Sequence, residues 1–182
     1  MKLWGNFVGY QLAWFITVIA AGRGMAWPGV LAALIFVAWQ LAVSTHAGAD
    51  IKLIVVSLVL GALIDGLASA AGWLDYAAPS PALPPHGAPV WILALWVSFA
   101  MTLNHALAYL RGRLLLSLVF GGVGAPLAYL GAARGWQAVT FTSPPWHAVV
   151  WIGLGWAVAM PVLANLAARL QRPARLPHAE AS

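Results

Sequence analysis

One carboxylic acid lies deep inside a long apolar segment of the chain. On a helix, Asp65 shares a face with Gly61 and lies close to the face of Gly72, which leaves room for a neighbouring helix to approach. Acids in such segments usually face the protein interior and often mark proton transfer, acid–base chemistry or head-group binding. The structural alternative is a buried acid held by Tyr129, Arg134 or a hydroxyl group.

A second group of polar residues falls where two other apolar segments end. His46 and Asp50 follow one segment, and Thr102, Asn104 and His105 lie near the end of another. Thr102 and His105 share a helical face, whereas Asn104 points about 100° away from His105. If these ends converge, the side chains line a polar pocket that opens inward. The structural alternatives are an interfacial His46 and a neutral His105 that bridges two helices.

These observations define the candidate site residues. We predict Asp65 and His105 as acid–base residues, with Asn104 or His46 orienting a polar head. The predicted substrate-binding residues are Asn6, His46, Asp50, Thr102, Asn104 and Tyr129.

Several chemistries are excluded by residue type and spacing. The five histidines are scattered, and a His-Glu-x-x-His zinc helix is absent because the only glutamate is Glu180. With no cysteine, the chain has no disulfide, thiolate metal site or cysteine nucleophile. The glycine-rich segment 121–126 lacks the lysine–hydroxyl pair of a phosphate-binding loop. We therefore expect no metal and no cofactor.

Composition determines which elements must position these residues. The 182 residues are 63% hydrophobic and 7% charged, whereas soluble domains have roughly 45–50% apolar and about 25% charged residues. This excludes aqueous enzymes and disordered chains. The net charge of +5 comes from scattered basic residues that flank apolar runs, so we expect no nucleic-acid partner. The composition indicates an integral membrane protein.

The apolar runs predict an all-α polytopic bundle, since a helix needs about 20 apolar residues to span the hydrocarbon. We expect one domain, 1–171, followed by a flexible cytoplasmic tail, 172–182. The six expected spans are 3–21, 28–45, 51–72, 89–110, 114–133 and 146–170. A proline-rich loop separates the third span from the fourth. The chain is rich in tryptophan, and we expect the deeper ones, among them Trp96 and Trp156, to pack within the protein.

Basic residues predict the orientation, because cytoplasmic connections carry more Lys and Arg. Placing the N-terminus inside leaves only Arg23 and Arg134 outside and predicts an N-in/C-in topology. The basic residues then placed inside are Lys2, Lys52, Arg111, Arg113, Arg169, Arg172 and Arg175. The alternative is a signal peptide cleaved near Ala20 and Ala21, but Lys2 is a thin basic region for one.

Several stretches of the chain also point to a family. They are Asn6, His46 with Asp50, Asp65 followed by Gly72 and Trp73, and the segments 99–107 and 124–129. In these features the chain resembles the bacterial family with domain of unknown function 2878. The resemblance implies a multi-pass protein of the inner membrane, with a hint of association with lipid-modifying enzymes. It implies no catalytic residue, because none is established for the family.

Three functions remain open from the sequence. The favoured one is handling or modifying a lipid, acyl or isoprenoid-type substrate, as an enzyme or as an accessory to one. Its expected partners are membrane lipids, a lipid-modifying enzyme or further copies of the chain. The alternatives are a small proton-coupled transporter in which Asp65 titrates, and a structural partner of another membrane protein.

Overall fold

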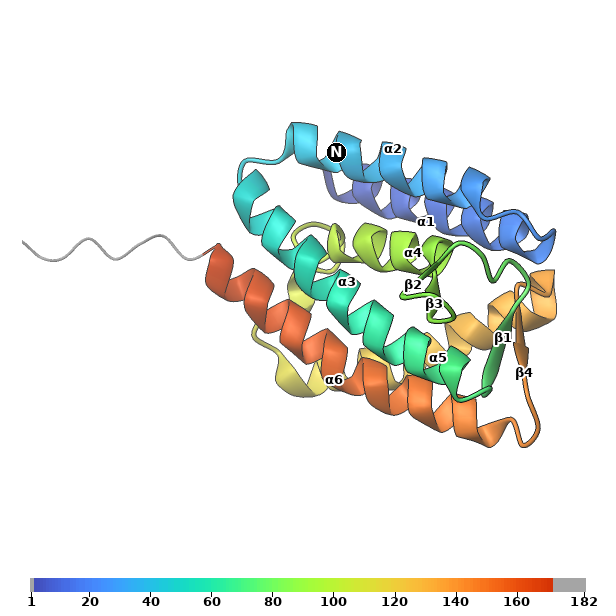
Figure 1. Cartoon of the computed structure of the whole chain (residues 1–182). Coiled ribbons are helices and arrows are strands. Elements are labelled where there is room, and N and C mark those ends of the chain that lie inside the picture. Colours follow the sequence, from blue (N-terminus) through green and yellow to red (C-terminus); the bar gives the residue numbers. More distant parts are fainter. Residues whose placement is uncertain (1, 172–182) are drawn as a thin grey trace, which may run out of the picture.

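The computed structural model describes residues 2–171 and shows a bundle of six α-helices with one short 3₁₀ helix (Figure 1). The predicted cytoplasmic tail, 172–182, lies outside the described residues. The helices are α1 (Lys2–Gly22), α2 (Trp27–Val43), α3 (Ala47–Ala70), α4 (Val90–Ala100), α5 (Leu114–Trp136) and α6 (Trp146–Leu170). Two antiparallel strand pairs tie the connections together: β1 (Leu74–Tyr76) with β4 (Val139–Phe141), and β2 (Ala82–Leu83) with β3 (Ala88–Pro89). The expected proline-rich loop is therefore partly ordered by short strands.

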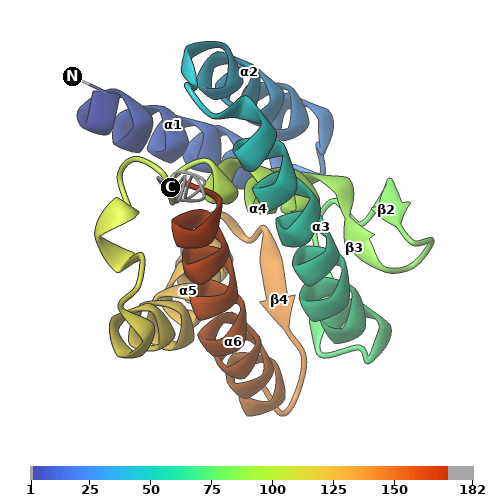
Figure 2. The same cartoon turned by 90° about the vertical axis from the view of Figure 1, so that its left-hand side faces the viewer.

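The helices form two packed pairs with α3 and α4 between them. α1 and α2 pack together on one side of the bundle, and α5 and α6 pack together on the other (Figures 1 and 2). α5 and α6 approach so closely that a Cβ atom on Gly121 would lie 2.2 Å from the Trp156 carbonyl oxygen. Small residues of α5 therefore allow this close helix–helix contact.

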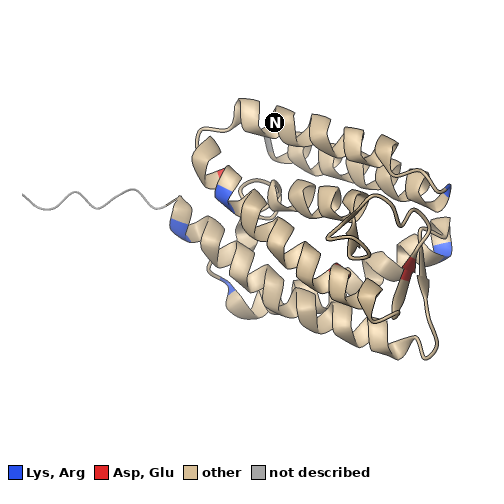
Figure 3. Cartoon of the chain, in the orientation of Figure 1, with Lys and Arg blue, Asp and Glu red and all other residues tan. Residues whose placement is uncertain are grey.

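Apolar side chains cover the outside of the bundle. Leu115 is 74% exposed and Leu154 is 63% exposed, and similar residues cover the outer faces of the other long helices. Four helices, α1, α3, α5 and α6, are long and apolar enough to cross a membrane, whereas α2 and α4 are shorter. The lysines and arginines of the described residues lie at the two ends of the bundle (Figure 3). This all-helical chain therefore fits a membrane protein.

The fourth segment differs from its prediction. A continuous helix over 89–110 is wrong beyond Ala100, because residues 101–107 form turns before the 3₁₀ helix Ala108–Leu110. The Thr102 hydroxyl donates to the Phe99 carbonyl oxygen at 2.7 Å, and the Asn6 side chain accepts from the Ala106 backbone N–H at 3.3 Å. Polar side chains thus replace the helical partners of this backbone.

Candidate functional site

The Asp65 carboxyl on α3 is fully buried and accepts three hydrogen bonds. The Tyr76 hydroxyl from β1 donates to Oδ1 at 2.8 Å, and the Trp96 indole from α4 donates to Oδ2 at 2.7 Å. The Tyr129 hydroxyl from α5 also donates to Oδ1. One carboxyl group therefore joins three other elements of the fold.

Glycine makes this arrangement possible on α3. A Cβ atom on Gly61 would lie 2.5 Å from Cδ1 of Trp96, so only glycine leaves the space that the indole occupies. Gly61 stands one helical turn before Asp65, which brings the Trp96 N–H onto the carboxyl group. The expected close approach of a neighbouring helix at Gly61 is confirmed.

The structure resolves which of the suggested partners Asp65 has. Tyr129 is a partner, as the structural alternative expected, but Arg134 is exposed near the end of α5 and makes no bond to the acid. Burial and the neighbouring Asp65 raise the pKa of Tyr76 well above its ordinary value, so this hydroxyl remains a proton donor. Within residues 2–171, no cation pairs with Asp65.

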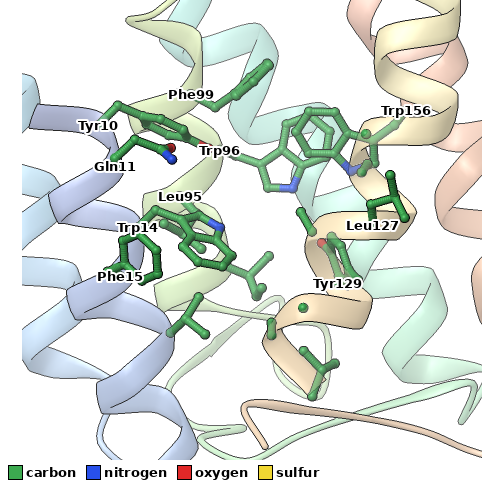
Figure 4. Close-up of a pocket in the computed structure, with 18 of the residues that line it drawn as sticks. Tyr10, Gln11, Trp14, Phe15, Leu95, Trp96, Phe99, Leu127, Tyr129 and Trp156 are labelled. Atoms are coloured by element: carbon green, nitrogen blue, oxygen red, sulfur yellow. The ribbon is translucent and has the colours of Figure 1, made fainter. Parts of the chain in front are cut away.

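A cavity of about 490 Å³ lies between α1, α4 and α5, beside this cluster (Figure 4). Its described lining contains ten aromatic residues and none of Asp, Glu, Lys, Arg or His. The aromatic lining residues are Tyr10, Trp14, Phe15, Trp91, Trp96, Phe99, Phe120, Tyr129, Trp136 and Trp156. Phe15 on α1 is 40% exposed and Leu127 on α5 is 62% exposed, so the cavity reaches the outer surface of the bundle.

Trp96 and Tyr129 separate the cavity from Asp65. Both side chains line the cavity and both donate to the carboxyl group, whereas Asp65 is absent from the described lining. Trp156 stacks on Trp96 with ring centroids 4.0 Å apart and completes this wall. A molecule in the cavity would therefore meet the two donors before it met the acid.

The second predicted group forms a separate hydrogen-bonded network at the other end of α3. Asp50 accepts from the Asn104 amide at 2.7 Å and from the Ser44 hydroxyl, which confirms that these two chain segments converge. Arg111 donates to Asn104 Oδ1 at 3.3 Å. Asp50 and Asp65 are 15 residues apart on one helix, which separates their backbones by about 22 Å. The two groups are therefore distinct.

Asn6 is buried at the same end and connects α1 to its neighbours. Its amide donates to Gln40 Oε1 on α2 at 2.8 Å and to the Met101 carbonyl oxygen at 3.1 Å. With the bond from Ala106, the side chain fixes the end of α4 and the turns that follow it. Its contacts are those of a residue that stabilises the irregular segment.

The remaining predicted residues lie outside the cavity. His46 is exposed beside α3, Thr102 is buried against its own backbone, and His105 is half-buried in the segment after α4. Of the eight predicted site residues, only Tyr129 belongs to the described cavity lining. In the part of the chain that the structure describes, no three His, Cys, Asp or Glu side chains gather as a metal site.

Sequence reasoning missed several groups that shape this region. Trp96 was expected only to pack, and Tyr76 lies in a connection that carried no signal for its contact with Asp65. Gln11 on α1 lines the cavity, and its position in the middle of an apolar segment was the signal that could have identified it. Intramembrane amides are costly unless they face a partner or a cavity.

The fold and the cavity define the class of protein. A helical bundle with apolar outer faces, charged ends and an uncharged internal cavity fits a membrane protein. Within that class, the chain belongs to the family described as "Protein of unknown function (DUF2878)", whose profile matches residues 3–162. This confirms the resemblance seen in the sequence. No curated protein and no solved structure matches the chain.

Proposed function

We propose that this protein crosses the bacterial inner membrane six times, with both termini in the cytoplasm, and binds a lipid-type molecule in the cavity between α1, α4 and α5. The distribution of charge supports the orientation. Lys52, Arg111, Arg113 and Arg169 lie at one end of the bundle, and Arg23 and Arg134 lie at the other. The end with more basic residues is the cytoplasmic one under the positive-inside rule.

The cavity carries the proposal for a lipid-type ligand. Its volume lies within the range of about 300–1,000 Å³ that is typical of ligand pockets. Phe15 and Leu127 are exposed at its rim on helices whose outer faces are apolar, so the opening faces the hydrocarbon. A mostly apolar molecule such as an acyl or isoprenoid chain therefore enters sideways from the bilayer, and it meets no charged side chain in the described lining.

Asp65 could take part in a reaction of a bound molecule only through the side chains that donate hydrogen bonds to it. Because Trp96 and Tyr129 lie between the acid and the cavity, a proton could pass to a bound molecule only from the Tyr129 hydroxyl, with Asp65 behind it. The proposal therefore assigns Asp65 the role of orienting Tyr129. His105 remains an acid–base prediction that this cavity does not use.

Filling the cavity tests the proposal. Gly124 and Gly131 line the cavity, and a Cβ atom at either position would meet nothing within 4 Å, so a side chain can begin at both positions without a clash. Gly135 on the same helix has equal space but lies outside the lining, and Gly135→Phe is the matched control. We expect purified Gly124→Phe and Gly131→Phe proteins to lose lipids that mass spectrometry detects in the wild type and in the control. Equal lipid content in all four proteins would refute lipid binding in this cavity.

The orientation has its own test, because the chain has no cysteine. His46 and Ser80 are exposed at opposite ends of α3 and its following loop. In intact spheroplasts, a membrane-impermeant maleimide should label Ser80→Cys and not His46→Cys. Labelling of His46→Cys alone would reverse the proposed topology.

A further inference from the structure

Two polar side chains in the middle of α1 face the cavity and have no hydrogen-bond partner among residues 2–171. They are the Tyr10 hydroxyl and the Gln11 amide, and both line the cavity (Figure 4). Asn6 on the same helix is different, because its amide group donates two hydrogen bonds and accepts one. In an apolar cavity an unpaired amide is unfavourable unless a ligand supplies its partner.

A third polar group lies on the opposite wall. The Trp156 indole Nε1 on α6 is buried and is the one buried side-chain polar atom in the described residues without a hydrogen bond. The Tyr129 hydroxyl oxygen is close enough to act as a weak acceptor for this indole N–H, but the contact falls short of a well-formed hydrogen bond. The Tyr129 hydroxyl directs its own proton to Asp65. An indole N–H only donates, so the group that completes this wall must be an acceptor.

The charge of the lining restricts that acceptor. No Lys, Arg or His belongs to the described lining, so an anionic head group would enter an apolar site without a counter-ion. A cation would be attracted to the faces of the aromatic rings, but it offers no acceptor to the Trp156 indole. The Asp65 carboxyl could not pair with it readily, because this group already accepts three hydrogen bonds. Both kinds of charged ligand are therefore disfavoured.

We infer that the cavity selects a long-chain molecule with an uncharged oxygen acceptor, such as a ketone, aldehyde or ester carbonyl, which bonds to Trp156 and Gln11. This inference rests on the proposed function and adds the chemistry of the ligand's polar group. Gln11 can donate to the same oxygen or accept from a neighbouring hydroxyl. The apolar remainder of the ligand lies along the aromatic wall.

Binding of matched probes tests the inference. The purified protein in nanodiscs is titrated with four radiolabelled probes of equal chain length: a methyl ketone, the alkane, the ionised fatty acid and an alkyl trimethylammonium ion. We expect the ketone to bind best. Trp156→Phe and Gln11→Leu should each weaken ketone binding about three- to tenfold, the loss of one hydrogen bond, and leave alkane binding unchanged. Trp39→Phe, the same change on a residue outside the cavity lining, is the control.

The outcomes separate this inference from the proposed function. Equal binding of ketone and alkane, or variants that keep the ketone preference, would overturn the inference while leaving lipid binding intact. Tighter binding of the fatty acid or the ammonium ion would overturn it as well. If neither ketone nor alkane binds to folded protein, the proposed function itself fails. Gln11→Leu keeps the test valid if Trp156→Phe does not fold, because leucine is well tolerated in a membrane helix.

Discussion

Replacing Asp65 with leucine should strongly destabilise the bundle, because the acid is the shared acceptor of three buried donors. The change leaves the Tyr76 and Tyr129 hydroxyls and the Trp96 indole without a partner in the protein interior. Hydrogen bonds between membrane helices average about 0.6 kcal/mol and reach about 1.7 kcal/mol. We therefore expect the free energy of unfolding to fall by about 2–5 kcal/mol in total.

The assay is unfolding of the purified protein in mixed micelles, followed by the loss of helical circular dichroism as the fraction of denaturing detergent rises. Tyr129→Phe removes only one of the three donors and should lower the stability by about 0.6–1.7 kcal/mol. In the double variant, the two losses should not add, because Tyr129→Phe also removes a donor that Asp65→Leu would leave unpaired.

Two results would refute this reasoning. The first is an Asp65→Leu protein whose unfolding free energy lies within about 0.5 kcal/mol of the wild type, the usual range for surface substitutions. The second is full additivity in the double variant. Either result would mean that the three contacts do not depend on the acid, and the proposed positioning of Tyr129 by Asp65 would lose its basis.

Three further predictions concern other parts of the fold. Gly61→Ala should lower the unfolding free energy by about 1–3 kcal/mol through its clash with Trp96, whereas Gly48→Ala, in open space on the same helix, should not lower it. Asn6→Leu should accelerate hydrogen exchange at the Ala106 amide and leave α6 unchanged. Above about pH 10 the tyrosines of the unfolded chain ionise, whereas the raised pKa keeps Tyr76 protonated in the folded protein. The free energy of unfolding should therefore fall as the pH rises, and it should fall less steeply in Tyr76→Phe.

The sequence identified the apolar segments but not where the fourth one breaks. Hydropathy over 89–110 favours one long helix, and in such a helix Thr102 and His105 fall on a common face. The break depends on Asn6, whose side chain accepts a hydrogen bond from the Ala106 backbone N–H, 100 residues further along the chain. Local periodicity carries no information about a partner at that separation, so the turn region could only emerge from the packed structure.

The site was predicted in part for a similar reason. The acid at position 65 and its small neighbour Gly61 are visible as types and spacing, and Tyr129 was named as a partner. Trp96 and Tyr76 were not, because their contacts depend on how α4 and β1 are rotated against α3. The cavity leaves even less trace, since it arises where Gly124 and Gly131 present no side chain toward α1.

Polar residues inside an apolar bundle fall into two kinds according to their partners. Asn6, Asp50, Asp65 and Asn104 have hydrogen-bond partners within the chain, and their contacts join different segments of the fold. The Gln11 amide and the Tyr10 hydroxyl have none among the described residues and face the cavity. Removing a polar group from water is unfavourable in both cases, but only the first kind has hydrogen bonds within the chain that compensate for it, so the second kind requires another partner. That difference, rather than polarity itself, makes α1 the wall on which a bound molecule should be sought.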